Sequence, residues 1–328
     1  MPNLITHALF ADDVLERLNN PLCNAKRKMF LTGSQGPDFL FFHHSDPFYD
    51  ILKPSDIRKY GRLFHNEHVN DFYLSALHSI ENEKNKDIQD DLIVYVCGHL
   101  CHWALDSTMH PLIYSKTGNC KGDSSWRHHQ FESMLDAAML KYRKNLTIAD
   151  YDFSKECFST SPQTARAMAR IYVPAIAEIY GEHVAPSSFL EVLKDWRRIE
   201  RHFRDPKDLK KKLLRPLEKM TRLEFLMTGF SIPAHYEDNV DICNLLHSPW
   251  RHPVSGEATT ASVFDLMETA LQKALRTIDL FETCLAHPGS PEDEQAFLDF
   301  LGDRNYEMDM PPGFLPTYFE LADLDQKI

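Results

Sequence analysis

The chain has 328 residues, of which 43% are hydrophobic, so it can bury a sizeable core in one large domain or two ordinary ones. A formal net charge of −12 disfavours a strongly basic nucleic-acid-binding protein, and a content of only 12 glycines disfavours an all-β sandwich or barrel rich in tight turns. The seven cysteines form no Cys-x-x-Cys pair, which favours reduced, buried thiols over a disulfide framework or a zinc ribbon.

The first 60 residues divide into one helix and one irregular segment. Apolar spacing predicts an amphipathic helix over residues 4–18. Residues 19–60 contain an aromatic-rich stretch typical of a functional loop. Its aromatic side chains either pack in the core or form an apolar wall beside a lipid-like substrate; they are Phe39, Phe41, Phe42, Phe48 and Tyr49.

Helical periodicity dominates the rest of the chain. A helix is predicted over residues 87–110, stopped by Pro111, with a polar loop over 112–124. The clearest helix begins after Ser262, a plausible N-cap. The other predicted helices cover residues 63–82, 125–144, 162–183, 187–203, 206–228 and 291–301. No alternating strand pattern stands out, so the prediction is an all-α protein: a metal-site region over residues 1–150 and a helical C-terminal region over 151–328, packed on it as one unit.

The N-terminus shows neither a positively charged leader nor an apolar core of signal-peptide length. The longest apolar stretch, residues 92–105, is too short to span a bilayer and contains two histidines. These features predict a cytoplasmic protein without a transmembrane segment.

Histidines and carboxylates recur at helical spacing between residues 99 and 132. At 100° per residue, His99, His102, Asp106 and His110 fall within an arc of roughly 80° on one helix. His128 and Glu132 form a further i, i+4 pair. Such pairs bind zinc on helices, and a central carboxylate can bridge two ions. A single buried histidine is usually a hydrogen-bonded core residue, but so many donors in register favour a metal site. Manganese and iron are the alternatives to zinc.

Not every histidine is expected to be a ligand. His99 faces the same stripe but is predicted to support a neighbour or pack in the core. His43, His44, His68 and His129 are predicted to be supporting or surface residues. Asp38, in Gly36-Pro37-Asp38, is a candidate ligand from a loop, with a helix cap as the plainer alternative. His7 and His65 complete the candidate set.

These motifs resemble the bacterial zinc-dependent phospholipase C family, which shares an all-helical fold with P1/S1-type nucleases. The resemblance covers residues 1–140. The motifs that carry it are THALF, GPD, LFHNEH, H-x-x-x-D with a following histidine, and H-x-x-x-E. It implies one zinc held by Asp38, His65, His102 and Asp106, and a second held by His110, His128 and Glu132. A third would be held by His7 and Asp106 with the N-terminal amine and carbonyl. The start Met1-Pro2-Asn3 and the short gap between Asp106 and His110 depart from the secreted members.

The resemblance implies a zinc-dependent phosphoester hydrolase acting on a phosphodiester, with a small phosphoester or a phospholipid head group as substrate. Two or three zinc ions would bind the phosphoryl oxygens and activate water, and Asp38 would orient or deprotonate that water. Two alternatives stay open: a nuclease or nucleotidase on the same scaffold, and a poorly active metal-binding domain whose C-terminal half recruits a partner.

Overall fold

The computed structural model describes residues 4–45, 55–221, 227–234, 236 and 240–324. In these ranges the regular structure is helical apart from one two-stranded hairpin and an isolated bridge between Arg204 and Ile232, so the all-α prediction is confirmed. The α-helices are α1 (Leu4–Leu18), α2 (Pro21–Ala25), α3 (Arg27–Gly33), α5 (Arg58–Asn66), α6 (Val69–Glu81), α7 (Lys86–Thr117), α8 (Asp123–Lys144), α9 (Phe153–Glu156), α10 (Pro162–Tyr180), α11 (Ser188–Phe203), α12 (Leu209–Thr221), α13 (Val263–Ala286) and α14 (Pro291–Leu301). Two 3₁₀ helices, η1 (Asp38–Phe42) and η2 (Met227–Phe230), and strands β1 (Trp250–Arg251) and β2 (Ala258–Thr259) complete the described elements.

Helix α7 is the central element, and it is longer than the sequence predicts. It was expected to stop at Pro111 but continues to Thr117, where Gly118 follows at φ +96°. A proline inside a helix costs ~3 kcal/mol or more. Beyond it, however, α7 buries Leu112, Ile113 and Tyr114, and each such side chain contributes ~1.5–3 kcal/mol when fully buried. Packing therefore outweighs the proline.

The predicted N-terminal loop and the predicted helix over residues 63–82 also need correction. The segment 19–60 contains two short helices, α2 and α3, and the 3₁₀ helix η1. The second helix is divided into α5 and α6, because His68 adopts a left-handed conformation at φ 59°. In the second half, α12 is shorter than the predicted helix over 206–228, and residues 222–226 lie outside the described part.

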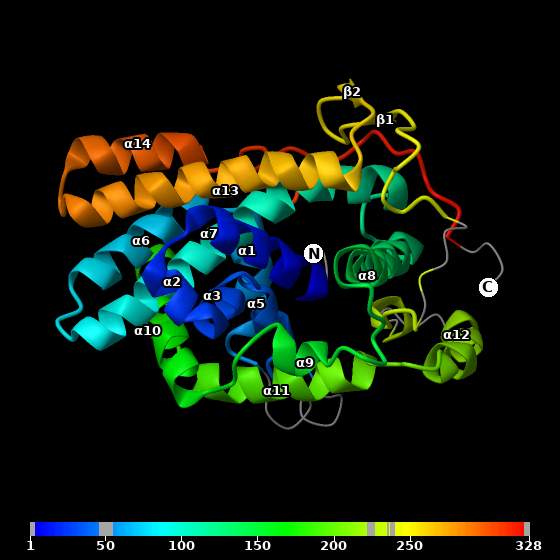
Figure 1. The fold of residues 1–328 in the computed structure, drawn as a ribbon, viewed down its shortest axis with the longest axis horizontal. Coiled ribbons are helices and arrows are strands. Elements are labelled where there is room, and N and C mark those ends of the chain that lie inside the picture. Colours follow the sequence, from blue (N-terminus) through cyan, green and yellow to red (C-terminus); the bar gives the residue numbers. More distant parts are fainter. Residues whose placement is uncertain (1–3, 46–54, 222–226, 235, 237–239, 325–328) are drawn as a thin grey trace.

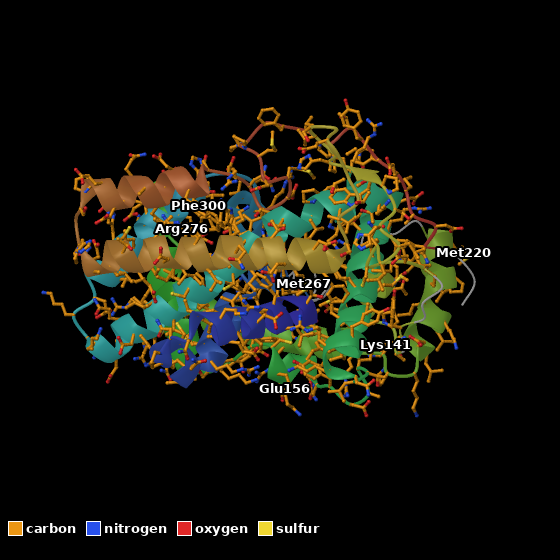
Figure 2. The ribbon with its side chains drawn as sticks, turned by 45° about the horizontal axis from the view of Figure 1, so that its top comes forward. Lys141, Glu156, Met220, Met267, Arg276 and Phe300 are labelled. Atoms are coloured by element: carbon orange, nitrogen blue, oxygen red, sulfur yellow. The ribbon has the colours of Figure 1, made fainter. Side chains whose placement is uncertain are left out.

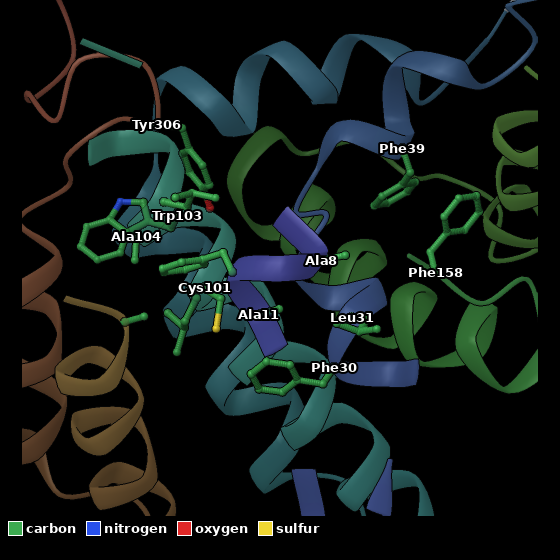
Figure 3. Packing of buried hydrophobic residues seen from close by; sticks show 14 of the residues in the cluster. Ala8, Ala11, Phe30, Leu31, Phe39, Cys101, Trp103, Ala104, Phe158 and Tyr306 are labelled. Carbon is green, nitrogen blue, oxygen red and sulfur yellow. The ribbon is translucent and has the colours of Figure 1, made fainter. Parts of the chain in front are cut away.

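Helices α1, α3 and α13 pack directly against α7, so segments far apart in sequence surround it (Figure 1). Helix α3 lies close against α7, because a glycine of each helix meets the backbone of the other. A Cβ at Gly33 would lie 2.1 Å from the carbonyl oxygen of Tyr95, and one at Gly98 would lie 2.1 Å from that of Phe30. Figure 3 shows Phe30 and Cys101 among the buried side chains of this region.

The remaining features of the fold concern its C-terminal half. Ser262 and Asp265 form a capping box at the start of α13, as the N-cap prediction for Ser262 requires. Helices α13 and α14 lie side by side, and Figure 2 labels Arg276 and Phe300 on them.

No helix in the described residues combines the length and apolar character needed to cross a membrane. All seven cysteines are free thiols. The predicted division at residue 150 stays a prediction.

Candidate metal centre

The loop after α3 brings a carboxylate against α7. Gly36 adopts φ +52°, and a Cβ there would lie 2.1 Å from Cδ2 of His102, so only glycine lets the loop pass this ring. The peptide oxygen of Ser34 also accepts a hydrogen bond from Nδ1 of His102, at 3.1 Å. As a result, Asp38 begins η1 directly beside the histidines of α7.

Four side chains converge at this point: Asp38, His65, His102 and Asp106, here called the first donor group. Their potential ligand atoms all lie within 4.8 Å of one another. Nε2 of His65 is 2.9 Å from Oδ1 of Asp38, and Nε2 of His102 is 3.0 Å from Oδ2 of Asp106. Ligands of one tetrahedral zinc ion lie roughly 3.3 Å apart, because each is about 2.0–2.1 Å from the metal. The spacing therefore fits a shared ion.

The second donor group consists of His110, His128 and Glu132. Oε1 of Glu132 lies 3.1 Å from Nε2 of His128 and 3.6 Å from Nε2 of His110. Nδ1 of His110 is also 3.8 Å from Oδ2 of Asp106, so the two groups adjoin on α7. Helix α8 supplies the other two donors from successive turns, as the i, i+4 spacing predicts.

Three of these imidazoles are held in one orientation by backbone carbonyls. Nδ1 of His65 donates to the carbonyl oxygen of Gly61 at 2.5 Å. Nδ1 of His110 donates to that of Tyr306 at 2.8 Å, and Nδ1 of His102 donates to that of Ser34. Because a carbonyl oxygen only accepts, the proton is on Nδ1 and the lone pair is on Nε2. That arrangement is usual for histidines that bind metals.

His7 approaches the same carboxylate from α1. Its Nε2 lies 3.1 Å from Oδ1 of Asp106, and its ring stacks on that of His102 with centroids 4.2 Å apart. The position of α1 is fixed by Asp136 on α8, which accepts hydrogen bonds from the amides of Ile5 and Thr6 at 3.0 and 2.8 Å. The expected contribution of the N-terminal amine concerns residues 1–3, which lie outside the described part of the chain.

His99 differs from the other histidines of α7. Its Nδ1 contacts the hydroxyl of Tyr73 at 2.8 Å and its Nε2 contacts that of Tyr172 at 2.9 Å. Both ring nitrogens are therefore engaged by tyrosines, although helical spacing alone places His99 on the same stripe. This agrees with the prediction that His99 supports or packs. The aromatic residue Phe39 likewise packs in the core, with its ring centroid 5.2 Å from that of Tyr172; Phe48 and Tyr49 are outside the described residues.

Sequence reasoning missed Tyr306, which comes from the irregular segment after α14. Its backbone amide donates to the carbonyl of His65 at 2.9 Å, and its carbonyl accepts from His110. Its hydroxyl lies 3.1 Å from that of Tyr73. No motif surrounds this residue, and backbone hydrogen bonds leave no residue-type signal, so the sequence offered no means of finding it.

A further group, His43, His44 and Glu191, also has potential ligand atoms within 4.8 Å of one another. Here it is called the η1–α11 cluster. Oε2 of Glu191 lies 3.3 Å from Nε2 of His44 and 4.0 Å from that of His43. The carboxylate of Glu191 is 45% exposed, whereas the carboxylates of the donor groups are buried. The sequence predicts supporting or surface positions for the two histidines, and in the structure both are buried.

The electrostatics of the donor groups favour an ionised carboxylate at Asp106 and neutral imidazoles at His7 and His128. His65 is the exception: burial lowers its pKa, but the carboxylates of Asp38 and Asp106 together outweigh burial and raise the pKa. Burial alone would raise the pKa of Asp106, but His102, His110 and His7 hold it well below its usual range. Burial lowers the pKa of His128 to about 4, although Glu132 acts in the opposite direction. Burial and the neighbouring His102 also lower the pKa of His7. These are the protonation states that bind a cation.

Several donor atoms have no hydrogen-bond partner among the residues that the structure describes. They are Nε2 of His65, His102 and His110 and both carboxylate oxygens of Asp106, and all of these atoms are buried. Buried polar groups are normally satisfied, and an unpaired buried carboxylate is costly. One cation in each donor group would satisfy these atoms together. The nitrogen and oxygen donors present suit zinc.

Comparison with known proteins agrees with this chemistry. A family model described as zinc-dependent phospholipase C matches residues 6–182, more than half of the chain. The chain belongs to this family. No curated protein and no solved structure gives a significant match. Membership supports zinc-dependent hydrolysis at the level of the family. The matched range includes every residue of both donor groups.

Proposed function

We propose that the protein is a zinc-dependent phosphodiesterase of the phospholipase C type. The observation that supports this most strongly is the convergence of buried imidazole nitrogens and carboxylate oxygens without hydrogen-bond partners among the described residues. The first donor group holds one ion and the second holds another. His7 and Asp106 contribute to a third position. Zinc bound in this way supplies positive charge for the phosphoryl oxygens and acidifies water.

The roles of the protein's own side chains follow from their burial. Asp38 is 7% exposed, the most exposed of the eight candidate ligands. It is therefore the carboxylate best placed to meet an entering water molecule, which it would orient and deprotonate. Asp106 is fully buried and contacts both His7 and His102, so it would supply negative charge to ions held on either side of it. The backbone carbonyls behind the imidazoles keep Nε2 aimed at the ions.

Metal analysis is the first test of this proposal. Protein purified without chelators should contain at least two transition-metal ions per chain, mainly zinc, by inductively coupled plasma mass spectrometry. His68→Ala is a suitable control, because this histidine is exposed and pairs with Asp71 rather than with a donor group. A content below one ion per chain, with no uptake of added zinc, would remove the enzyme hypothesis.

A substrate panel then tests the reaction. Phosphatidylcholine, a simple aryl phosphodiester, an aryl phosphomonoester and a nucleotide should be compared before and after chelation. We expect hydrolysis of the phosphodiesters, loss of activity with chelator and recovery with zinc. Preference for the nucleotide would favour the nucleotidase alternative. Full metal content with no hydrolysis of any member would favour the metal-binding domain without activity.

A further inference from the structure

Helix α12 lies outside the family match and displays an apolar stripe on the surface. Leu209, Leu213, Leu217 and Met220 are 55%, 71%, 53% and 74% exposed. At 100° per residue they fall within an arc of about 80°. Most exposed hydrophobic residues occur singly and need no explanation, but four on one helical face form a contiguous patch. Met220 lies at the outer edge of the molecule in Figure 2.

The opposite face of α12 attaches the helix to the protein. The guanidinium of Arg215 lies 3.4 Å above the ring of Trp126. The buried carboxylate of Glu218 accepts hydrogen bonds from the amide of Thr228, at 3.0 Å, and from its hydroxyl. Polar and aromatic contacts therefore hold this helix, and Leu209, Leu213 and Leu217 are left facing outward. The orientation is the reverse of that expected for an amphipathic helix whose only role is to cover a core.

Positive charge surrounds the stripe. Residues 194–215 contain ten lysines or arginines against four acidic residues, in a chain whose net charge is −12. Lys212 lies on one flank of the stripe and Lys210 on the other, and both are exposed. Nζ of Lys210 donates to the carbonyls of His202 and Arg204, which joins the start of α12 to the end of α11.

The basic character continues along α11 into a surface hollow of about 430 Å³. Lys194, Arg198 and Arg201 are exposed there at helical spacing, and the hollow is also lined by Arg197 and His202. Such a hollow attracts anions. An apolar stripe flanked by lysines, joined through Lys210 to a helix with an anion-attracting surface, matches the two layers of an anionic lipid surface: acyl chains below and phosphate head groups above.

We propose that α12 and the basic end of α11 dock the protein on an anionic lipid bilayer. The four apolar side chains of α12 enter the boundary between head groups and acyl chains. The lysines and arginines of the two helices bind the lipid phosphates. Attachment is peripheral and reversible, because one short helix buries little apolar surface. This inference does not depend on the proposed hydrolysis, since the docking residues lie outside both donor groups.

Vesicle sedimentation with the full chain tests the inference. The protein is mixed with vesicles of phosphatidylcholine alone, or of phosphatidylcholine and phosphatidylglycerol in equal parts. We expect binding to the anionic vesicles only, weakened by high salt because lipid–protein charge attraction is screened. The double variant Leu213→Gln, Met220→Gln should lower the partition coefficient at least about tenfold. Replacing Lys194 and Arg201 by Gln should lower it by about fivefold for each charge removed.

Leu246→Gln is the matched control, because this leucine is 80% exposed on a different segment and should bind vesicles like the unaltered protein. Far-ultraviolet circular dichroism checks that each variant is folded. Failure of the unaltered protein to bind anionic vesicles would overturn the inference, as would undiminished binding by the folded α12 variant. A dimer in light scattering that this variant abolishes, without vesicle binding, would assign the surface to self-association instead and also overturn it.

Discussion

The donor groups and the η1–α11 cluster use the same residue types but differ in how these are held. In the first donor group Asp106 is fully buried, and the Nδ1 atoms of His65 and His102 donate to backbone carbonyls. In the η1–α11 cluster Glu191 is 45% exposed, and Nδ1 of His43 contacts the side-chain hydroxyl of Ser55 at 2.8 Å. An exposed carboxylate is already solvated and gains less from a cation. Burial and backbone support, rather than ligand type, therefore distinguish the two sites.

The largest effect is expected from Asp106→Asn. The amide keeps the shape of the side chain but removes the negative charge that His7 and His102 both face. Zinc affinity should fall by more than about 100-fold, beyond the ~10–100-fold typical of residues that only support ligands. Competition with a chromophoric chelator measures the zinc affinity of the variant and of the unaltered protein. Zinc affinity equal to that of the unaltered protein would contradict the central role of this carboxylate.

Gly98→Ala tests whether backbone packing holds the first donor group. The added Cβ would lie 2.1 Å from the carbonyl oxygen of Phe30, so α3 must move away from α7. Overpacking of this kind costs about 1–3 kcal/mol in the free energy of unfolding. Urea denaturation measures that cost, and zinc affinity should fall with it.

Gly289→Ala is the control for this substitution, because its Cβ would meet no atom within 4 Å. The positive φ of +73° at Gly289 is then the source of strain, so the free energy of unfolding should fall by about 1 kcal/mol. If Gly98→Ala proves no more destabilising than the control, the close contact between α3 and α7 does not constrain the site.

His99→Ala should have a smaller effect on zinc than Asp106→Asn. It removes two contacts with tyrosine hydroxyls and leaves a cavity behind the first donor group, but no ligand is lost. We expect zinc affinity to fall by about tenfold. A greater loss than that of Asp106→Asn would mean that the ligands of α7 are shifted by one turn.

Glu191→Gln should be nearly silent for zinc. The amide can still contact His44, and the carboxylate it replaces is half in solvent. Stoichiometry by mass spectrometry should be unchanged, and zinc affinity should stay within about twofold, since exposed ion pairs contribute ~0–1 kcal/mol. Loss of a whole equivalent of metal would show that the η1–α11 cluster is an ion site and that exposure does not separate the two regions.

Local patterns in the sequence predict much of the fold, and they fail where tertiary contacts decide. The helix over residues 4–18 and the cap at Ser262 depend on neighbouring residues, and both appear in the structure as predicted. The passage of α7 through Pro111 depends on burial that the local sequence does not reveal.

The same contrast holds for the site. Helical spacing brings His102, Asp106 and His110 onto one face, but it could not show that tyrosines occupy both nitrogens of His99. Nor could it show that His43 and His44 are buried against α11. The ligand assignments themselves stay predictions until metal is measured.

Tyr306 has a consequence for the order in which the protein matures during synthesis. All donor residues have been translated once Glu132 is added, yet the carbonyl that orients His110 arrives 196 residues after that histidine. A ribosome-bound chain that ends before residue 306 therefore presents the ligands without their full support. We expect such a chain to retain zinc less well than one in which the segment around Tyr306 is folded in place, so metal loading would be completed only after that segment has joined the site. Zinc retention by ribosome-free chains ending at residues 302 and 324 would measure the difference.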